Sequence, residues 1–166
     1  MDDKKIKEIL LNGLPNKIKN GNEIFKAKSG YEKILCDELE WKCEKSTYWD
    51  ADKNGIKIEI KKGNIWLNVR RYAEMVFNKI DYSNDITAIF TKNTKIKNIK
   101  AVYFLKTSLI IKDVLKIDNK IAKQVLDMDK HWKKCEYLGN DTDSQVNFKV
   151  GAYKKLSFCS KIFDIK

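Results

Sequence analysis

The 166-residue sequence contains a single proline, Pro15, and only seven glycines, so it has no Pro- or Gly-rich tract of the kind found in linkers. No uninterrupted apolar run approaches the roughly 20 residues that a membrane-spanning helix requires. The opening residues, MDDKKIKEIL, lack the apolar core of a signal peptide. These absences predict a soluble, cytoplasmic protein that forms one domain over residues 1–166 and does not bind a membrane.

Histidine and cysteine are too sparse for a structural zinc site. The sequence has one histidine and four cysteines without any C-x-x-C pair, whereas a zinc site needs four closely spaced ligands. We therefore expect His131 to be structural. We also expect buried thiols in a reducing compartment at Cys36, Cys43, Cys135 and Cys159.

The balance of charge is strongly basic. The formal net charge is +11, with 34 basic residues against 23 acidic ones, and all but two of the basic residues are lysine. The codon bias of an AT-rich genome explains lysine in place of arginine, but it does not explain the excess of base over acid. Because neutralised phosphates release counterions, a protein this basic commonly binds a polyanion. Nucleic acid is therefore the expected partner.

Hydrophobic periodicity predicts helices and strands within one domain. Helices are expected at residues 6–14, 30–41 (with Ser29 as its N-cap), 69–80 and 119–132. Strands are expected at 46–52, 56–61, 86–90, 101–105 and 146–150, and residues 109–114 are expected to pair with 101–105. This order predicts a mixed α/β (α+β) fold, with a central mixed sheet flanked by helices.

One stretch of the sequence combines a tight turn with closely spaced charges. Asn54-Gly55 is a strong signal for a β-hairpin, and the six residues after it alternate strictly between apolar and charged. The hairpin places Asp50 near Glu59 on the neighbouring strand, with Lys61 on the same face as Glu59. Two carboxylates beside an ammonium suit Mg²⁺, which takes a few oxygen ligands from the protein and keeps several waters.

The same residues allow simpler interpretations. Alternating Lys and Glu also form the solvated face of an ordinary amphipathic strand. Asp52 competes with Asp50 for the role of first acid, but its position beside the turn favours an Asx role. Glu32, on the preceding helix, either supplies an additional acid or is simply solvated. Trp49 and Trp66 flank the patch, and we expect both to pack in the core.

The pattern resembles the signature of the PD-(D/E)xK nuclease superfamily, in which one strand of a hairpin carries an acid and the next carries E-x-K. The matching pieces are Asp50 and Ile58-Glu59-Ile60-Lys61, although Trp49 stands where the signature has proline. Three further segments share the order and spacing of short type II restriction endonucleases: residues 101–116, 132–134 and 146–150.

This resemblance implies a restriction-endonuclease-like core and a type II endonuclease that hydrolyses both strands of double-stranded DNA at a short palindromic site. The implied catalytic residues are Asp50, Glu59 and Lys61. The implied Mg²⁺ ligands are Asp50, Glu59 and the backbone carbonyl of Ile60, and no small-molecule cofactor is implied. A homodimer is also implied, with the helices of residues 1–45, above all the apolar face of residues 6–14, as the expected interface.

Five more residues are expected to contact DNA. Arg70 and Arg71 are the only arginines, and they lie side by side after the proposed active-site strand. A guanidinium fork fits guanine O6 and N7, although a phosphate contact or a surface ion pair is an equal alternative. Asn64 and Asn68 carry amides of the type that contact adenine, and Lys62 adds a further positive charge.

Two other functions fit part of this pattern. A structure-specific nuclease, such as a junction resolvase, would use Glu32, Asp50, Glu59 and Lys61 on branched DNA. A non-catalytic basic protein would bind DNA or RNA without cutting it. Binding alone gives no reason for acids in a surface that faces phosphates, because they repel the ligand.

Overall fold

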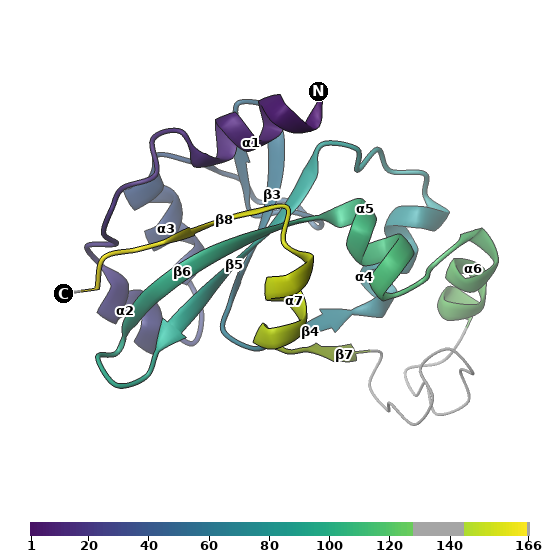
Figure 1. The fold of residues 1–166 in the computed structure, drawn as a ribbon. Helices are drawn as coiled ribbons and strands as arrows, with labels where there is room; N and C mark the ends of the chain where they lie inside the picture. The colour runs from purple at the N-terminus through teal and green to yellow at the C-terminus, as the bar shows by residue number, and fades with distance from the viewer. Residues whose placement is uncertain (128–144, 166) are drawn as a thin grey trace.

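The computed structural model describes residues 1–127 and 145–165, and these residues form a mixed α/β fold (Figure 1). A six-stranded sheet has the order β1-β2-β3-β5-β6-β8, and helices cover both of its faces. A separate two-stranded sheet joins β4 to β7 below α7 in the view of Figure 1. The predicted class, a central mixed sheet flanked by helices, is confirmed.

The described part of the chain contains the following strands and helices. The strands are β1 Lys42–Cys43, β2 Ala51–Lys53, β3 Ile56–Lys62, β4 Ile65–Asn68, β5 Asp85–Asn93, β6 Asn98–Lys106, β7 Gln145–Phe148 and β8 Cys159–Ile162. The helices are α1 Asp3–Leu11, α2 Gly21–Lys26, α3 Tyr31–Leu39, α4 Val69–Phe77, α5 Thr107–Leu109, the π-helical turn η1 Ile110–Val114, α6 Asn119–Asp127 and α7 Val150–Leu156.

The β2–β3 hairpin forms where the sequence predicts it. Asn54 and Gly55 have φ angles of 52° and 87°, the left-handed conformations that a type I′ turn requires at both central positions. Asp52 Oδ1 accepts a 2.9 Å hydrogen bond from the Gly55 amide, which is the Asx role expected for this residue. The register pairs Ala51 with Ile58, so the residue before Ala51 lies next to the centre of β3.

Strand β3 carries apolar side chains on one face and charged side chains on the other. Its three isoleucines are 0 % exposed and join a core that includes buried residues of α1, α2 and α3. Burying a side chain of this size contributes about 1.5–3 kcal/mol each. Glu59 and Lys61 alternate with these isoleucines and therefore face the other side, where α4 leads from β4 to the parallel strand β5.

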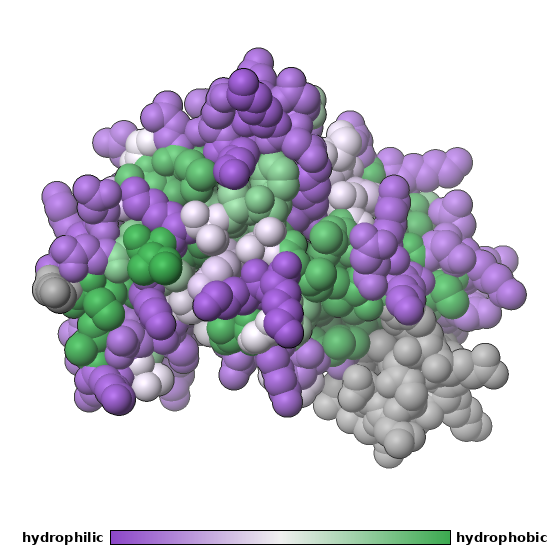
Figure 2. Space-filling view, in the orientation of Figure 1, coloured by the Kyte–Doolittle hydropathy of each residue, from purple (hydrophilic) through white to green (hydrophobic). Residues whose placement is uncertain are grey.

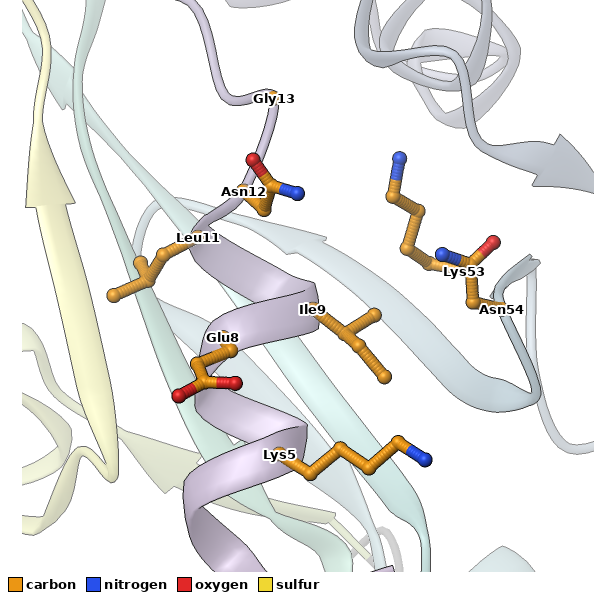
Figure 3. A pocket seen from close by; sticks show the side chains of 8 residues that line it. All are labelled: Lys5, Glu8, Ile9, Leu11, Asn12, Gly13, Lys53 and Asn54. Atoms are coloured by element: carbon orange, nitrogen blue, oxygen red, sulfur yellow. The ribbon is translucent and has the colours of Figure 1, made fainter.

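The N-terminal helix uses its apolar face inside the chain. Asp2 caps α1 through its side chain, and Ile6 and Leu10 are buried against the sheet. The apolar face of residues 6–14, which we expected at a dimer interface, is therefore already covered. Ile9 borders a cavity of about 730 Å³ between α1 and the β2–β3 turn; Figure 3 shows its side chain directed toward that turn.

Several predicted elements differ from the observed ones. Residues 109–114 do not form a strand but belong to α5 and η1, because a short apolar run fits a buried helix as well as a strand. Of the strand predicted at 46–52, only residues 51 and 52 are in a strand, β2. The N-cap of α3 is Gly30 in the left-handed conformation, not Ser29.

Some predictions concern residues that the structure does not describe. The roles expected for His131 and Cys135, the segment 132–134 and the end of the helix expected at 119–132 lie outside the described residues. Among the other cysteines, Cys36 and Cys159 are buried as expected, whereas Cys43 is exposed. In the described parts of the chain, no helix has both the length and the apolar character needed to cross a membrane.

Candidate active site

Asp50 is fixed at the end of the β2–β3 ladder. Its amide donates a 2.9 Å hydrogen bond to the Ile58 carbonyl, and its Oδ2 accepts a 2.8 Å hydrogen bond from the Ile60 amide. In an extended strand, the N–H and C=O of one residue point to the same edge, so the Ile60 carbonyl lies at the edge where Asp50 sits. The pairing of β2 with β3 extends only to Ala51 and Ile58, so Ile60 lies beyond it.

Glu59 is largely buried, with a side chain that is 12 % exposed. Its Oε1 lies 2.7 Å from Lys61 Nζ, and its Oε2 lies 3.0 Å from Arg71 Nη2. Burial raises the pKa of Glu59 above its ordinary value, the charges of Arg71 and Lys61 oppose this, and the charge of Asp50 adds to it. The hairpin thus brings together all three residues that the sequence predicted to be catalytic.

Arg71 belongs to this site and does not project into solvent. Its side chain is 15 % exposed, and besides Glu59 it binds the backbone carbonyl of Tyr48, two residues before Asp50. Its guanidinium also lies 5.3 Å from the centroid of the Tyr72 ring. Of the alternatives that the sequence left open for Arg71, the structure contains an ion pair, and this pair is partly buried.

The oxygen atoms at this site suit a small hard cation. Asp50, Glu59 and the Ile60 carbonyl offer two carboxylates and one neutral oxygen, a set that Mg²⁺ completes with water. Among the described residues, no group of three or more His, Cys, Asp or Glu side chains is placed to hold a metal ion. Both Glu59 oxygens are ion-paired to Lys61 and Arg71, so a bound cation would share or replace one of these contacts.

Lys62 lies on the other face of β3 and binds the C-terminal end of α2. Its Nζ donates to the carbonyls of Ile24, Phe25 and Ala27 at 2.6, 3.1 and 2.5 Å. The same ammonium sits 4.6 Å from the centroid of the Tyr31 ring. These contacts hold α2 against the sheet. They also engage the Lys62 ammonium, which we expected to face DNA, in bonds within the protein.

Helix α3 brings two further side chains toward the acids. Burial raises the pKa of Tyr31, and the charges of Glu32, Asp50 and Glu59 raise it further. Glu32 also hydrogen-bonds to the Tyr31 side chain. The sequence left Glu32 open as either an additional acid or a solvated side chain, and it contained no signal for Tyr31, whose aromatic ring fits the apolar stripe of the helix.

The β4–β7 ribbon presents a polar face beside the site. Its register pairs Trp66 with Asn147 and Asn68 with Gln145, and all four residues are exposed. Trp66 is 56 % exposed, so the expectation that it packs in the core is wrong. Asn68 also caps α4 by accepting a 3.2 Å hydrogen bond from the Arg71 amide. The strand predicted at 146–150 overlaps β7, but the sequence missed β4 and its pairing with β7, because β4 is short and the two strands are about 80 residues apart.

The remaining predicted DNA contacts lie at the two ends of this ribbon. Arg70, in the first turn of α4, has a 44 % exposed side chain and lies 3.8 Å from Glu74. Asn64, just before β4, accepts a 3.3 Å hydrogen bond from the Val150 amide at the start of α7. Both residues can therefore reach a ligand that lies along the ribbon.

The fold and the site define a mixed α/β protein with a hairpin that carries two acids and a lysine. Comparison with protein-family models, with curated proteins and with solved structures found no match. The geometry of these residues is therefore the basis on which a function is proposed.

Proposed function

We propose that this chain is a Mg²⁺-dependent, site-specific DNA endonuclease of the PD-(D/E)xK type, with a restriction-endonuclease-like core. The observation that carries the proposal is the hairpin geometry: Asp50 on one segment hydrogen-bonds to the amide of Ile60, the central residue of Glu59-Ile60-Lys61 on the next. This is the arrangement of an acid followed by E-x-K that the superfamily signature describes. The net charge of +11 supports a polyanionic substrate.

Each residue of the site has a defined task in phosphodiester hydrolysis. Asp50, Glu59 and the Ile60 carbonyl would hold Mg²⁺, which polarises the scissile phosphate and lowers the pKa of water. Lys61, 2.7 Å from Glu59, orients or deprotonates the attacking water, and its charge offsets the charge that develops on the phosphate. Arg71 keeps the Glu59 carboxylate in place from the opposite side.

The β4–β7 ribbon supplies the contacts to the DNA bases. A two-stranded ribbon fits the major groove, and Asn and Gln side chains make paired hydrogen bonds with adenine. Asn68, Gln145 and Asn147 lie on its exposed face, and Trp66 between them offers an apolar surface to a thymine methyl group. Arg70, at the end of the ribbon, adds a guanine or phosphate contact.

Digestion of plasmid and phage DNA with purified protein tests the proposal. We expect discrete fragments that require Mg²⁺, and a loss of at least about 100-fold in rate for Glu59→Gln, because the metal loses a ligand. Glu8→Gln, on the surface of α1, is the matched control and should cut normally. Cutting of branched DNA alone would instead indicate a structure-specific nuclease. Salt-sensitive binding of DNA without cutting of any DNA substrate would refute the endonuclease proposal.

A further inference from the structure

A cavity of about 280 Å³ opens at the end of the β4–β7 ribbon that is farther from α4. Asn64, which leads into β4, and Val150, which follows β7, both belong to its wall. The floor comes from the ends of β5 and β6, and one side comes from α7. The side chains of the wall that carry polar groups are those of Lys92, Lys100, Lys154, Thr91, Thr94, Asn64 and Tyr103.

This wall carries hydrogen-bond donors and no carboxylate. Three lysines supply ammonium groups, Thr94 and Tyr103 supply hydroxyls, and the Asn64 side-chain nitrogen is a further donor. The Thr91 hydroxyl already donates a 3.4 Å hydrogen bond to the Ala101 carbonyl. The Asn64 oxygen already accepts the Val150 amide, which fixes the orientation of that side chain. Two other cavities in the described part of the chain differ: Glu8 lines one beside α1, and Asp81 lines one beyond α4. A donor-rich, acid-free wall selects an anion.

The local backbone is adapted to keep one of these lysines at the cavity. Gly63 has a φ of +77°, and a Cβ atom there would lie 2.9 Å from Lys92 Cε. Glycine therefore both permits the turn after β3 and leaves room for the lysine stem. Lys92 Nζ in turn lies 5.0 Å from the centroid of the Phe25 ring, a contact that restrains the ammonium without neutralising it. Figure 2 shows purple, hydrophilic side chains gathered over the region of α7, beside which this cavity lies.

We propose that this cavity binds a phosphate group of the DNA backbone, at the opposite end of the ribbon from the cut; this rests on the proposed function. The Asn68 end of the ribbon adjoins Arg71 and so Glu59, and the Asn64 end adjoins the cavity. A four-residue strand spans about 13 Å at about 3.3 Å per residue. That length matches about four base pairs at about 3.4 Å each, so the phosphate lies a few nucleotides from the scissile one.

The salt dependence of binding to a short duplex tests this site. The triple variant Lys92→Gln, Lys100→Gln and Lys154→Gln is compared with a control triple of the same charge change, Lys5→Gln, Lys53→Gln and Lys112→Gln. Affinity is measured by fluorescence anisotropy over a range of NaCl, with Ca²⁺ in place of Mg²⁺, and circular dichroism checks the fold. The slope of log K against log [salt] is negative, and we expect its magnitude to decrease by about 0.9 for each phosphate that the cavity triple no longer neutralises. The control triple should keep the slope of the wild type.

The outcomes separate this site from the endonuclease itself. Cleavage at discrete sites together with an unchanged salt slope in the cavity triple would overturn the phosphate site and leave the endonuclease standing. Duplex binding that depends on the cavity lysines, in a protein that cuts no DNA, would support the site and refute the endonuclease. Binding of inorganic phosphate is the third measurement. If phosphate binds the wild type but not the cavity triple, and both proteins bind the duplex with equal affinity, the cavity binds a free ion. That result would overturn the proposed contact with DNA.

Discussion

Arg71 joins the two chain segments that carry the acids. Its guanidinium binds Glu59 on β3 and the Tyr48 carbonyl, just ahead of Asp50. Both contacts come from Nη2, whose two N–H groups point in fixed directions within the guanidinium plane, whereas a lysine ammonium rotates freely on a flexible stem. The neighbouring Arg70 is more exposed and lies near Glu74 on its own helix. Two adjacent arginines thus have different surroundings, and substitution can compare them directly.

We expect Arg71→Lys to reduce the efficiency of cleavage by about 10- to 100-fold, the usual cost of losing a group that orients a metal ligand. The reduced efficiency should appear mainly as a higher Mg²⁺ concentration for half-maximal activity. The reason is that the proposed metal ligand Glu59 is no longer held by Arg71, while Lys61 is unchanged. Arg70→Lys is the control and should leave the Mg²⁺ dependence unchanged. Equal effects of the two substitutions would show that Arg71 does not position Glu59.

Asp85, at the start of β5, is an ionisable group buried at a cost to stability. It is 7 % exposed, and burial, followed by the charge of Asp81, raises its pKa to about 6. Between about pH 4 and pH 6, the native state therefore binds more protons than the unfolded state. The free energy of unfolding consequently falls as pH rises through this window, and the loss is complete above it.

Asp85→Asn should remove this cost. We expect the variant to be more stable than the wild type by about 1–3 kcal/mol at neutral pH, with a benefit that shrinks as pH falls toward 4. Urea unfolding at several pH values measures it, and Asp113→Asn on the exposed side of η1 is the control. A benefit that is independent of pH would mean that packing or hydrogen bonding, not ionisation, explains the change.

At the scale of elements, local sequence signals predicted the β2–β3 hairpin and its charged residues. The pairing of strands that are distant in the sequence could not be predicted from such signals. The Asn54-Gly55 turn and the alternation after it depend on neighbouring residues only, so the sequence located Asp50, Glu59 and Lys61 correctly beside one another. Helix α2 was missed because six residues give little periodicity. Strand β4 and its pairing with β7 were missed because pairs such as Trp66 and Asn147 form between distant segments.

The ribbon yields a prediction about sequence specificity. We expect Gln145→Ala and Asn147→Ala each to cost about 1–3 kcal/mol in discrimination at one base pair and to relax the cleavage site at that position. Asn68 is less suited to this test, because it also caps α4 and its removal would destabilise the helix. Sequencing of cleaved ends from a randomised DNA library measures the effect. An unchanged site preference in both variants would remove the ribbon from base recognition.

In the proposed dimer, two copies of the chain act together and each cuts one strand of the DNA. The described part of the chain contains one set of Asp50, Glu59 and Lys61, so each copy would bring one proposed site. Ile6 and Leu10 on the apolar face of α1 are buried within the chain, whereas Ile9 and Leu11 are only partly buried. Phe77, at the end of α4, is 52 % exposed and shows that apolar surface remains available elsewhere.

Mixing experiments reveal whether two copies cooperate. We expect wild-type protein alone to convert supercoiled plasmid to the linear form, since a symmetric dimer places one site on each strand. Refolding wild type together with a large excess of Glu59→Gln should place most wild-type chains in mixed dimers, which cut one strand and therefore accumulate nicked circles. Glu8→Gln in the same excess should still yield linear DNA. If the Glu59→Gln mixture gives linear DNA at a reduced rate and no excess of nicked circles, the copies act independently and the dimer proposal fails.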